Sequence, residues 1–468
     1  MLYRKIWLTS VIIIATLFVI VVRADFDNDT PIQAHITLDP QIVFQTITGW
    51  EATAQAGEQD SPAFMNYRDA LYDLAANDLG INRLRVEIYS SAENPTDYFA
   101  NYMNGTASPA EWKQNRQASI NDNADPTTLD PRGFHFSMLD HTIENVFLPL
   151  QKRLSARGEK LWLNLTYVDF AESPFEHRNA PTEYAEFVLA TYQHLQTQYG
   201  LVPDTWEVIL EPDNTQWSGK QISEAMVAAG KLLQANGFTP AFIAPSATNM
   251  SKAIELFDEM MRVPGAPAYL VEFAYHRYSG VSDANLRAIA ERAIKFNVRT
   301  AMLEHIGSDY QDLHQDLSAG RNSAWQQFTL AYPTDDNGAQ YYWINDRDPV
   351  NPQINLGRQA RFLHQYFKFI RAGAVRINAT TTNTSFDPVA FINANGKYVV
   401  VVKTSTEGTF AVEGLPAGTY GLKYTTAHEY AVDLADATIG AGEALNVHIP
   451  SAGVITIYTK LIPGSVNP

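Results

Sequence analysis

The chain of 468 residues is acidic: 34 lysines and arginines stand against 51 aspartates and glutamates, giving a formal net charge of -17 at pH 7. Because such a chain repels phosphate backbones, we expect no nucleic-acid partner. The sequence contains no cysteine, which excludes disulfides, thiolate catalysis and cysteine-ligated metal sites.

Residues 1–24 carry the pattern of a signal peptide. Arg4 and Lys5 precede an apolar run at 6–22, and small residues precede a possible cleavage site after Ala24. The apolar run is also just long enough for an uncleaved membrane anchor. In either case we expect the body of the protein to lie outside the cytoplasm, as an extracellular, periplasmic or membrane-anchored protein.

From residue 42 to residue 373, short apolar runs alternate with amphipathic segments that have helical spacing, such as 62–78 and 181–200. The eight apolar runs are 42–50, 81–89, 160–168, 205–211, 240–247, 269–278, 299–305 and 340–344. Eight strands separated by helices predict a (β/α)8 TIM barrel. The alternative, a doubly wound sheet, requires a GxGxxG turn after the first strand, and the segment 49–57 does not supply one.

The pattern changes after the barrel. Residues 375–460 hold short strands separated by Asn-Gly and other glycine-rich turns, which predicts an antiparallel β-sandwich domain. Residues 32–41 are expected to add strands to this domain.

Two of the predicted barrel strands end on a glutamate. Glu211 closes the fourth run just before a proline, and Glu304 stands in the same position of the seventh run. Because both runs end at the same rim of the barrel, the two carboxyl groups are expected to face each other. A glycosidase requires one carboxyl group that protonates the leaving oxygen and another that attacks the sugar or activates water. The simpler interpretation is two solvated glutamates at strand ends.

Four segments carry a further signal: TITGWEAT, NRLRVEI, AYHRYS and the passage FKFIRAGAVRI from the last helix into the β-sandwich. These segments resemble motifs of glycoside hydrolase family 30 of clan A. The resemblance runs through most of the mature chain. It implies a retaining β-glycosidase that acts on a β-linked oligo- or polysaccharide, with Glu211 as the acid/base and Glu304 as the nucleophile.

Leu210 departs from the pattern of the clan, which usually has an asparagine before the acid/base to hold the 2-hydroxyl of the sugar. Asn214 and Asn164 are candidate substitutes. The departure leaves two alternatives open. One is a non-catalytic carbohydrate-binding protein on a disabled barrel, and the other is an exo-acting or uronic-acid-recognising enzyme of the same clan.

Arg85 is predicted to support Glu304. It alternates with Leu84 and Val86, so its side chain points opposite to theirs, toward the barrel mouth. An arginine beside a carboxylate lowers the pKa of that carboxylate and keeps it ionised, which suits a nucleophile. A structural ion pair with Glu87 or another acid is the alternative.

Other candidates for substrate binding occur near the ends of predicted strands. His276 and Tyr278 are expected to orient Glu304 or to donate to sugar hydroxyls, and Glu51 is expected to bind hydroxyls at the innermost subsite.

Trp343, at the end of the eighth run, is expected to stack on the apolar face of a pyranose. Trp50, Tyr167 and Trp217 are further candidates for stacking on a sugar ring. Packing in the core is the competing interpretation for each of these aromatic residues.

The sequence offers no pattern for a metal or a cofactor. No HExxH motif, no calcium-loop spacing and no GxSxG elbow occur, and the segment 125–136 is interpreted as a loop near the barrel mouth. We therefore expect neither a metal nor a cofactor.

Overall fold

The computed structural model describes residues 31–170 and 173–461. The predicted signal peptide or anchor at residues 1–24 lies outside these ranges. Within them, no helix combines the length and the apolar character that crossing a membrane requires.

Eight parallel strands form a closed barrel, because β9 pairs with β8 on one side and with β2 on the other. The strands in ring order are β2 (Gly49–Thr53), β3 (Arg83–Tyr89), β4 (Trp162–Val168), β5 (Thr205–Glu207), β6 (Phe242–Asn249), β7 (Leu270–Ser279), β8 (Arg299–Glu304) and β9 (Asn322–Tyr332). The predicted (β/α)8 barrel is therefore confirmed.

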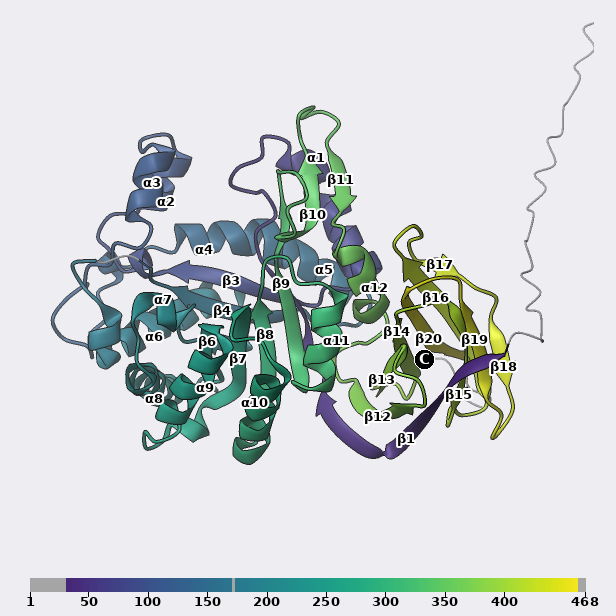
Figure 1. The fold of residues 1–468 in the computed structure, drawn as a ribbon. Helices are drawn as coiled ribbons and strands as arrows, with labels where there is room; N and C mark the ends of the chain where they lie inside the picture. Colours follow the sequence, from purple (N-terminus) through teal and green to yellow (C-terminus); the bar gives the residue numbers. More distant parts are fainter. Residues whose placement is uncertain (1–30, 171–172, 462–468) are drawn as a thin grey trace, which may run out of the picture. The chain divides into compact units, whose positions relative to one another are not determined.

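Helices lie on the outside of the barrel strands (Figure 1). The α-helices of the described residues are α1 (Phe64–Asp73), α2 (Tyr98–Met103), α3 (Pro109–Asn115), α4 (Ser137–Thr142), α5 (Leu148–Ser155), α6 (Pro181–Tyr199), α7 (Pro212–Thr215), α8 (Gly219–Ala235), α9 (Met250–Met260), α10 (Asp283–Phe296), α11 (Tyr310–Ser318) and α12 (Ala360–Phe367). Of these, α2 and α3 stand away from the barrel wall, beyond the end of β3 (Figure 1). Local sequence sets the ends of the helices. The first residue of α6 is Pro181, and this helix ends before Gly200, which adopts a left-handed conformation. A capping box between Ser218 and Gln221 begins α8.

The eighth barrel strand is β9, and the prediction of residues 340–344 for this place was wrong. Those residues form β10 (Gln340–Asn345), which lies outside the ring, parallel to β9 and antiparallel to β11 (Gln353–Leu356). The polar residues of β9 obscured its apolar pattern. Gln326 and Gln327 are fully buried and donate hydrogen bonds to Thr53 Oγ1 at 2.8 Å and Gly338 O at 2.6 Å.

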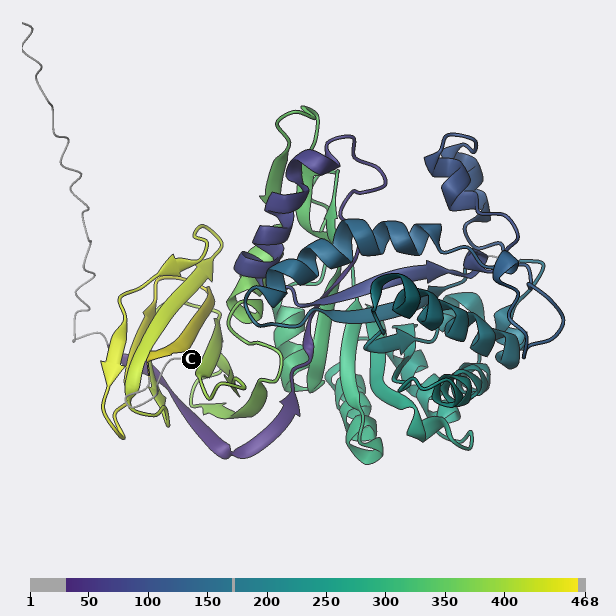
Figure 2. The same cartoon turned by 180° about the vertical axis from the view of Figure 1, so that it is seen from behind.

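The C-terminal part of the chain and the strand β1 (Ile32–Thr46) form a ten-stranded sheet with its own apolar core. Its strands are β1, β12 (Val375–Thr381), β13 (Phe386–Ile392), β14 (Tyr398–Thr404), β15 (Gly408–Glu413), β16 (Gly418–Thr426), β17 (Val432–Asp433), β18 (Ala437–Ile439), β19 (Leu445–Ile449) and β20 (Gly453–Leu461). The long strand β1 pairs antiparallel with β12 and parallel with β15, and then leads to the barrel (Figure 2).

Helix α12 joins the barrel to this sheet. Buried Gln365 donates to Thr425 Oγ1 at 2.8 Å and accepts a hydrogen bond from Thr456 Oγ1 at 2.8 Å. On the barrel side, Phe367 stacks on Trp50 with ring centroids 4.5 Å apart. The two parts are thus held by buried hydrogen bonds as well as apolar packing.

A network of buried ion pairs occupies the amino end of the barrel strands. Arg83, the first residue of β3, pairs with Glu51 on β2 and with Glu272 on β7, and all three side chains are fully buried. Arg299, the first residue of β8, donates to Glu272 Oε1 at 3.0 Å. Burial would lower the pKa of Arg83, but the charges of Glu272 and Glu51 raise it, so the guanidinium stays charged.

We predict that Arg83→Met lowers the free energy of unfolding by about 3–5 kcal/mol, because it leaves the buried carboxylate of Glu51 without a cation and that of Glu272 with Arg299 alone. Denaturant unfolding followed by circular dichroism measures this change. The control is Arg287→Met, which removes an exposed i,i+4 pair with Asp283 and should leave stability almost unchanged. Equal stability of the two variants would contradict a structural role for the network.

Candidate active site

Glu211 lies beyond the end of its barrel strand. The paired part of β5 ends at Glu207, so the prediction that Glu211 is the last residue of the strand was wrong. Glu211 is instead the N-cap of the short helix α7, with the left-handed angles φ 51° and ψ 63°. A non-glycine residue in this region costs about 1–2 kcal/mol, and such strain gathers at functional sites.

Glu304 is the last residue of β8, as predicted, and its carboxylate is held from two sides. Arg85 Nη2 forms a short ion pair with Glu304 Oε2, and Tyr278 OH donates to Glu304 Oε1 at 2.9 Å. Arg85 is itself fixed, because it also donates to Leu303 O and Thr53 Oγ1, both at 3.0 Å. The fully buried arginine therefore has one defined orientation.

These contacts set the ionisation of Glu304. Burial alone would raise the pKa of its carboxyl group, but the charges of Arg85 and His276 and the hydrogen bonds from Arg85 and Tyr278 lower it below the ordinary value. The pKa of Arg85 is raised in turn, since the charges of Glu304, Glu207 and Glu87 outweigh the effect of burial. Glu304 is thus an anion throughout the neutral and weakly acidic range.

The two glutamates face each other across His276. One oxygen of Glu211, one oxygen of Glu304 and a ring nitrogen of His276 all lie within 4.8 Å of one another. His276 Nδ1 lies 3.0 Å from Glu211 Oε1, and Asn214 Nδ2 donates to Glu211 Oε2 at 2.8 Å. Two carboxylates and an imidazole could in principle bind a metal, but each of the four carboxylate oxygens already has a hydrogen-bonding partner.

Leu210 points away from this pair. It is buried in a small apolar cluster with Tyr89, Phe99, Trp112 and Val168, most of which comes from the β3 end and the following insertion. Leu210 thus packs away from the carboxyl pair, and a substitute for the missing asparagine must come from Asn164 or Asn214.

Asn214 contacts Glu211, whereas Asn164 is fully buried. The amide of Asn164 donates to Glu51 Oε1 at 3.4 Å, and its oxygen accepts from Thr205 Oγ1 at 3.0 Å. Of the two, Asn214 is the amide that the structure brings to the carboxyl pair.

The structure does not bring all the predicted residues together. Glu51 is fully buried in the ion network with Arg83. Trp50 stacks on Phe367 and donates from Nε1 to a backbone oxygen, so it packs in the core. Tyr167 and Trp217, 0% and 3% exposed, contact each other edge to face.

Trp343 is partly exposed on β10, opposite Tyr332 of β9 and Asn355 of β11. It therefore lies on the hairpin outside the barrel ring, and it does not line the cleft described next.

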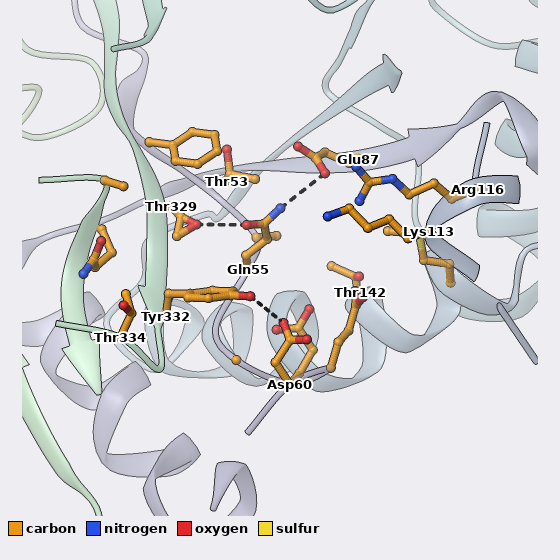
Figure 3. Close-up of a pocket in the computed structure, with 18 of the residues that line it drawn as sticks. Thr53, Gln55, Asp60, Glu87, Lys113, Arg116, Thr142, Thr329, Tyr332 and Thr334 are labelled. Atoms are coloured by element: carbon orange, nitrogen blue, oxygen red, sulfur yellow. Dashed lines mark hydrogen bonds between the residues drawn. The ribbon is translucent and has the colours of Figure 1, made fainter. Parts of the chain in front are cut away.

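A cleft of about 460 Å³ opens at the carboxyl ends of β2, β3 and β9. Figure 3 shows Gln55 at its centre, where it donates to Glu87 Oε2 at 3.4 Å and accepts from Thr329 Oγ1 at 3.2 Å. Thr53 lines the cleft and also accepts a hydrogen bond from Arg85. The cleft therefore lies next to the arginine that pairs with Glu304.

Sequence reasoning missed most of the residues that line this cleft. The helices α2 and α3 stand in a long insertion after β3, and this insertion supplies Tyr102, Trp112, Lys113 and Arg116. The insertion has no strand pattern that would place it at the barrel mouth. Tyr332, whose hydroxyl donates to Asp60 at 3.0 Å, belongs to the unpredicted strand β9.

Comparison with known proteins supports the same fold. Residues 373–457 match the sequence model of the glycosyl hydrolase family 30 beta sandwich domain. The chain is similar to a GH30 endoxylanase from Clostridium papyrosolvens C71, with 17% identity and a TM-score of 0.64 over 91% of this chain and 99% of that chain. A comparison with curated proteins finds no match.

Two further solved structures are similar. The catalytic domain of GH30 xylanase C from Talaromyces cellulolyticus has 16% identity and a TM-score of 0.67, over 91% of this chain and 100% of that chain. An endo-β1,6-glucanase has 15% identity and a TM-score of 0.63, over 91% of this chain and 94% of that chain. At these identities the likeness shows the fold. The predicted resemblance to family 30 is confirmed in the barrel architecture and in the β-sandwich sequence.

We predict that Tyr278→Phe raises the pKa of the Glu304 carboxyl group, because the variant removes one of the donors that stabilise its ionised form. The measurement is a pH titration of the ¹³C carboxyl resonances of glutamate, with the Glu304 signal identified by its absence in Glu304→Gln. Tyr199→Phe is the matched control, since its hydroxyl donates to Glu144. An unshifted Glu304 titration in Tyr278→Phe would show that the hydrogen bond contributes nothing.

Proposed function

We propose that the protein is a secreted retaining β-glycosidase that hydrolyses β-linked oligo- or polysaccharides. The observation that carries the proposal is the carboxyl pair: oxygens of Glu211 and Glu304 lie within 4.8 Å of each other. Retaining enzymes place their carboxyl groups about 5–5.5 Å apart, whereas inverting enzymes leave about 6.5–9.5 Å for a water molecule. The family 30 match of the β-sandwich supports the same class of enzyme.

Glu304 is the proposed nucleophile. Its carboxylate attacks the anomeric carbon as the glycosidic bond breaks, which forms a covalent glycosyl ester. A nucleophile must be ionised in the free protein, and the lowered pKa of Glu304 meets this requirement. Arg85 and Tyr278 hold the carboxylate in place and also help it to leave in the second step.

Glu211 is the proposed acid/base. It gives its proton to the departing oxygen in the first step and takes a proton from the incoming water in the second. His276 Nδ1, 3.0 Å from Glu211 Oε1, accepts a hydrogen bond from the acid form or donates one to the carboxylate. Asn214 fixes the other oxygen of Glu211, so the carboxyl group keeps its orientation in both steps.

The cleft beside this pair is the proposed binding site for the sugar chain. Its walls combine aromatic rings, among them Trp112 and Tyr332, with hydrogen-bonding side chains such as Gln55. This combination is suited to pyranose rings, which present both apolar faces and hydroxyl edges. Because the similar structures include xylanases and an endo-β1,6-glucanase, xylan and β1,6-glucan are the first substrates to test.

We predict that Glu304→Gln abolishes turnover of every substrate, because no covalent intermediate forms. Glu211→Gln should lower kcat/KM on a polysaccharide by about a hundredfold or more. It should have a smaller effect on a dinitrophenyl β-glycoside, whose leaving group needs no proton. Initial rates measure both effects, and ¹H NMR of the first product reports the anomeric configuration.

Glu255→Gln is the matched control, because this glutamate forms an ion pair with Lys252 on the exposed surface of α9. Substantial residual activity of Glu304→Gln would contradict the nucleophile assignment, and an inverted first product would contradict retention. A wild-type protein that binds glycans without releasing reducing ends would instead be the non-catalytic carbohydrate-binding protein.

A second candidate is a clan A glycosidase that recognises an acidic sugar chain. Lys113 and Arg116 on and after α3 line the cleft, and Figure 3 shows both directed toward the side of Glu87. Neither forms an ion pair in the part of the chain that the structure describes. Arg116 lies over the ring of Tyr89, 5.3 Å from its centroid. Two cations that make no direct ion pair among the described residues favour a uronic acid on the substrate.

We predict that Lys113→Met combined with Arg116→Met lowers kcat/KM on glucuronic-acid-substituted xylan about tenfold more than on unsubstituted xylan, since a hydrogen bond to a charged group contributes about 1.5–3 kcal/mol. Lys220→Met on α8 is the control, because its exposed side chain forms a surface ion pair with Glu224. An equal loss of kcat/KM on both substrates would show that the two cations do not bind an acidic substituent.

A further inference from the structure

A second group of acidic side chains gathers where the insertion after β3 meets helix α6. Asp122 comes from the insertion, and Glu183 and Glu186 come from the first two turns of α6. Residues three apart on a helix lie on the same face, so both glutamates point toward Asp122. One oxygen of each of the three residues lies within 4.8 Å of the others.

One carboxylate oxygen of each of these three acids is buried without a hydrogen-bond donor among the described residues. Glu183 and Glu186 are 8% and 3% exposed. Among the described residues, nothing donates to the buried Oε2 of Glu183, the buried Oε2 of Glu186 or the buried Oδ1 of Asp122. The amide oxygen of the neighbouring Asn121 is also buried without a donor. Buried polar atoms without partners are rare in folded proteins, because each costs about 1–3 kcal/mol.

The surroundings add no positive charge. No lysine or arginine in residues 31–170 and 173–461 forms an ion pair with the three acids, and Glu93 adds a further carboxylate nearby. Glu93 accepts from the backbone of Asp122 at 3.0 Å and contacts His177 Nε2 at 2.6 Å. Burial, followed by the charges of Asp122 and Glu183, raises the pKa of Glu186 to about 8.

We propose that Asn121, Asp122, Glu183 and Glu186 bind a calcium ion. Three carboxylates and an amide oxygen are the hard ligands that Ca²⁺ takes, and its flexible coordination accepts an irregular set completed by water. The expectation of no metal came from the absence of a contiguous calcium loop. The ligands here come from two segments that lie about sixty residues apart in the sequence, which no loop motif describes.

The ion would fasten the insertion to the barrel. Asp122 Oδ2 accepts from the backbone of Asp130 at 2.6 Å and from Asn123 Nδ2 at 2.8 Å, so the loop is folded around this residue. The same insertion carries α3, whose Trp112 lines the cleft. A cation between Asp122 and α6 therefore stabilises one wall of the cleft without touching the carboxyl pair.

The alternative for this cluster is a proton shared between Glu183 and Glu186. A shared proton satisfies these two side chains, but it leaves the buried oxygens of Asn121 and Asp122 without a partner. Calcium binding accounts for all four residues, and the two explanations predict opposite effects of removing a carboxylate charge.

The test is the melting temperature of the full chain in EDTA and in a Ca²⁺ titration, with isothermal titration calorimetry for stoichiometry. We expect saturating Ca²⁺ to raise the Tm by about 5 °C, with one ion bound per chain. Mg²⁺ should raise it less, because Mg²⁺ demands near-octahedral geometry. Glu186→Gln and Glu183→Gln should fold and should lose the Ca²⁺ response, while the exposed Glu111→Gln on α3 should keep it.

Two results would overturn the proposal. One is a wild-type Tm that Ca²⁺ leaves unchanged while Glu186→Gln raises it in EDTA, which is the result expected of a shared proton. The other is an equal Ca²⁺ response in wild type and Glu186→Gln, which would place the ion elsewhere. Neither readout depends on glycosidase activity, so the outcome is independent of the proposed function.

Discussion

The ion pair between Arg85 and Glu304 sets the conditions for every other feature of the site. Arg85 begins on the second barrel strand and reaches Glu304 at the end of the seventh, so the pair forms only when the barrel is closed. In a buried setting neither charge is tolerable without the other. The fold therefore fixes the ionised state and the position of Glu304 together, and Tyr278 and His276 complete the arrangement from the neighbouring strand β7.

Arg83 and Arg85 show how one strand serves both stability and chemistry. Residues two apart on a strand share a face, so both guanidinium groups point into the barrel. Arg83, at the amino end, satisfies Glu51 and Glu272, and these groups are sealed from solvent. Arg85, one layer higher, reaches the rim where the cleft opens. This division follows the general rule that the carboxyl ends of barrel strands carry function and the amino ends carry stability.

The sequence predicted what depends on local pattern. Glu304 was placed correctly because its strand is apolar up to that residue. Glu211 was placed on a strand because Val208, Ile209 and Leu210 are apolar and buried. The backbone N–H groups of Val208 and Leu210 still donate to Ile243 O and Tyr167 O of the neighbouring strands, but the regular strand ends at Glu207. The sequence did not predict the last barrel strand, β9, because its glutamines Gln326 and Gln327 resemble surface residues. Their burial depends on hydrogen-bonding partners that are distant in the sequence. The insertion after β3 carries no periodic signal, so its place at the cleft follows only from tertiary packing.

The insertion after β3 explains why the residue before Glu211 is a leucine. Leu210 is 5% exposed and packs against Phe99 of α2 and Trp112 of α3, which cover the position where the clan usually has an asparagine. An asparagine amide in this apolar cluster would lack partners, at a cost of about 1–3 kcal/mol. A leucine at position 210 thus suits the apolar cluster that α2 and α3 form with the ends of β3 and β4. It does not itself indicate a disabled site, because Asn214, four residues further on, supplies an amide that contacts Glu211.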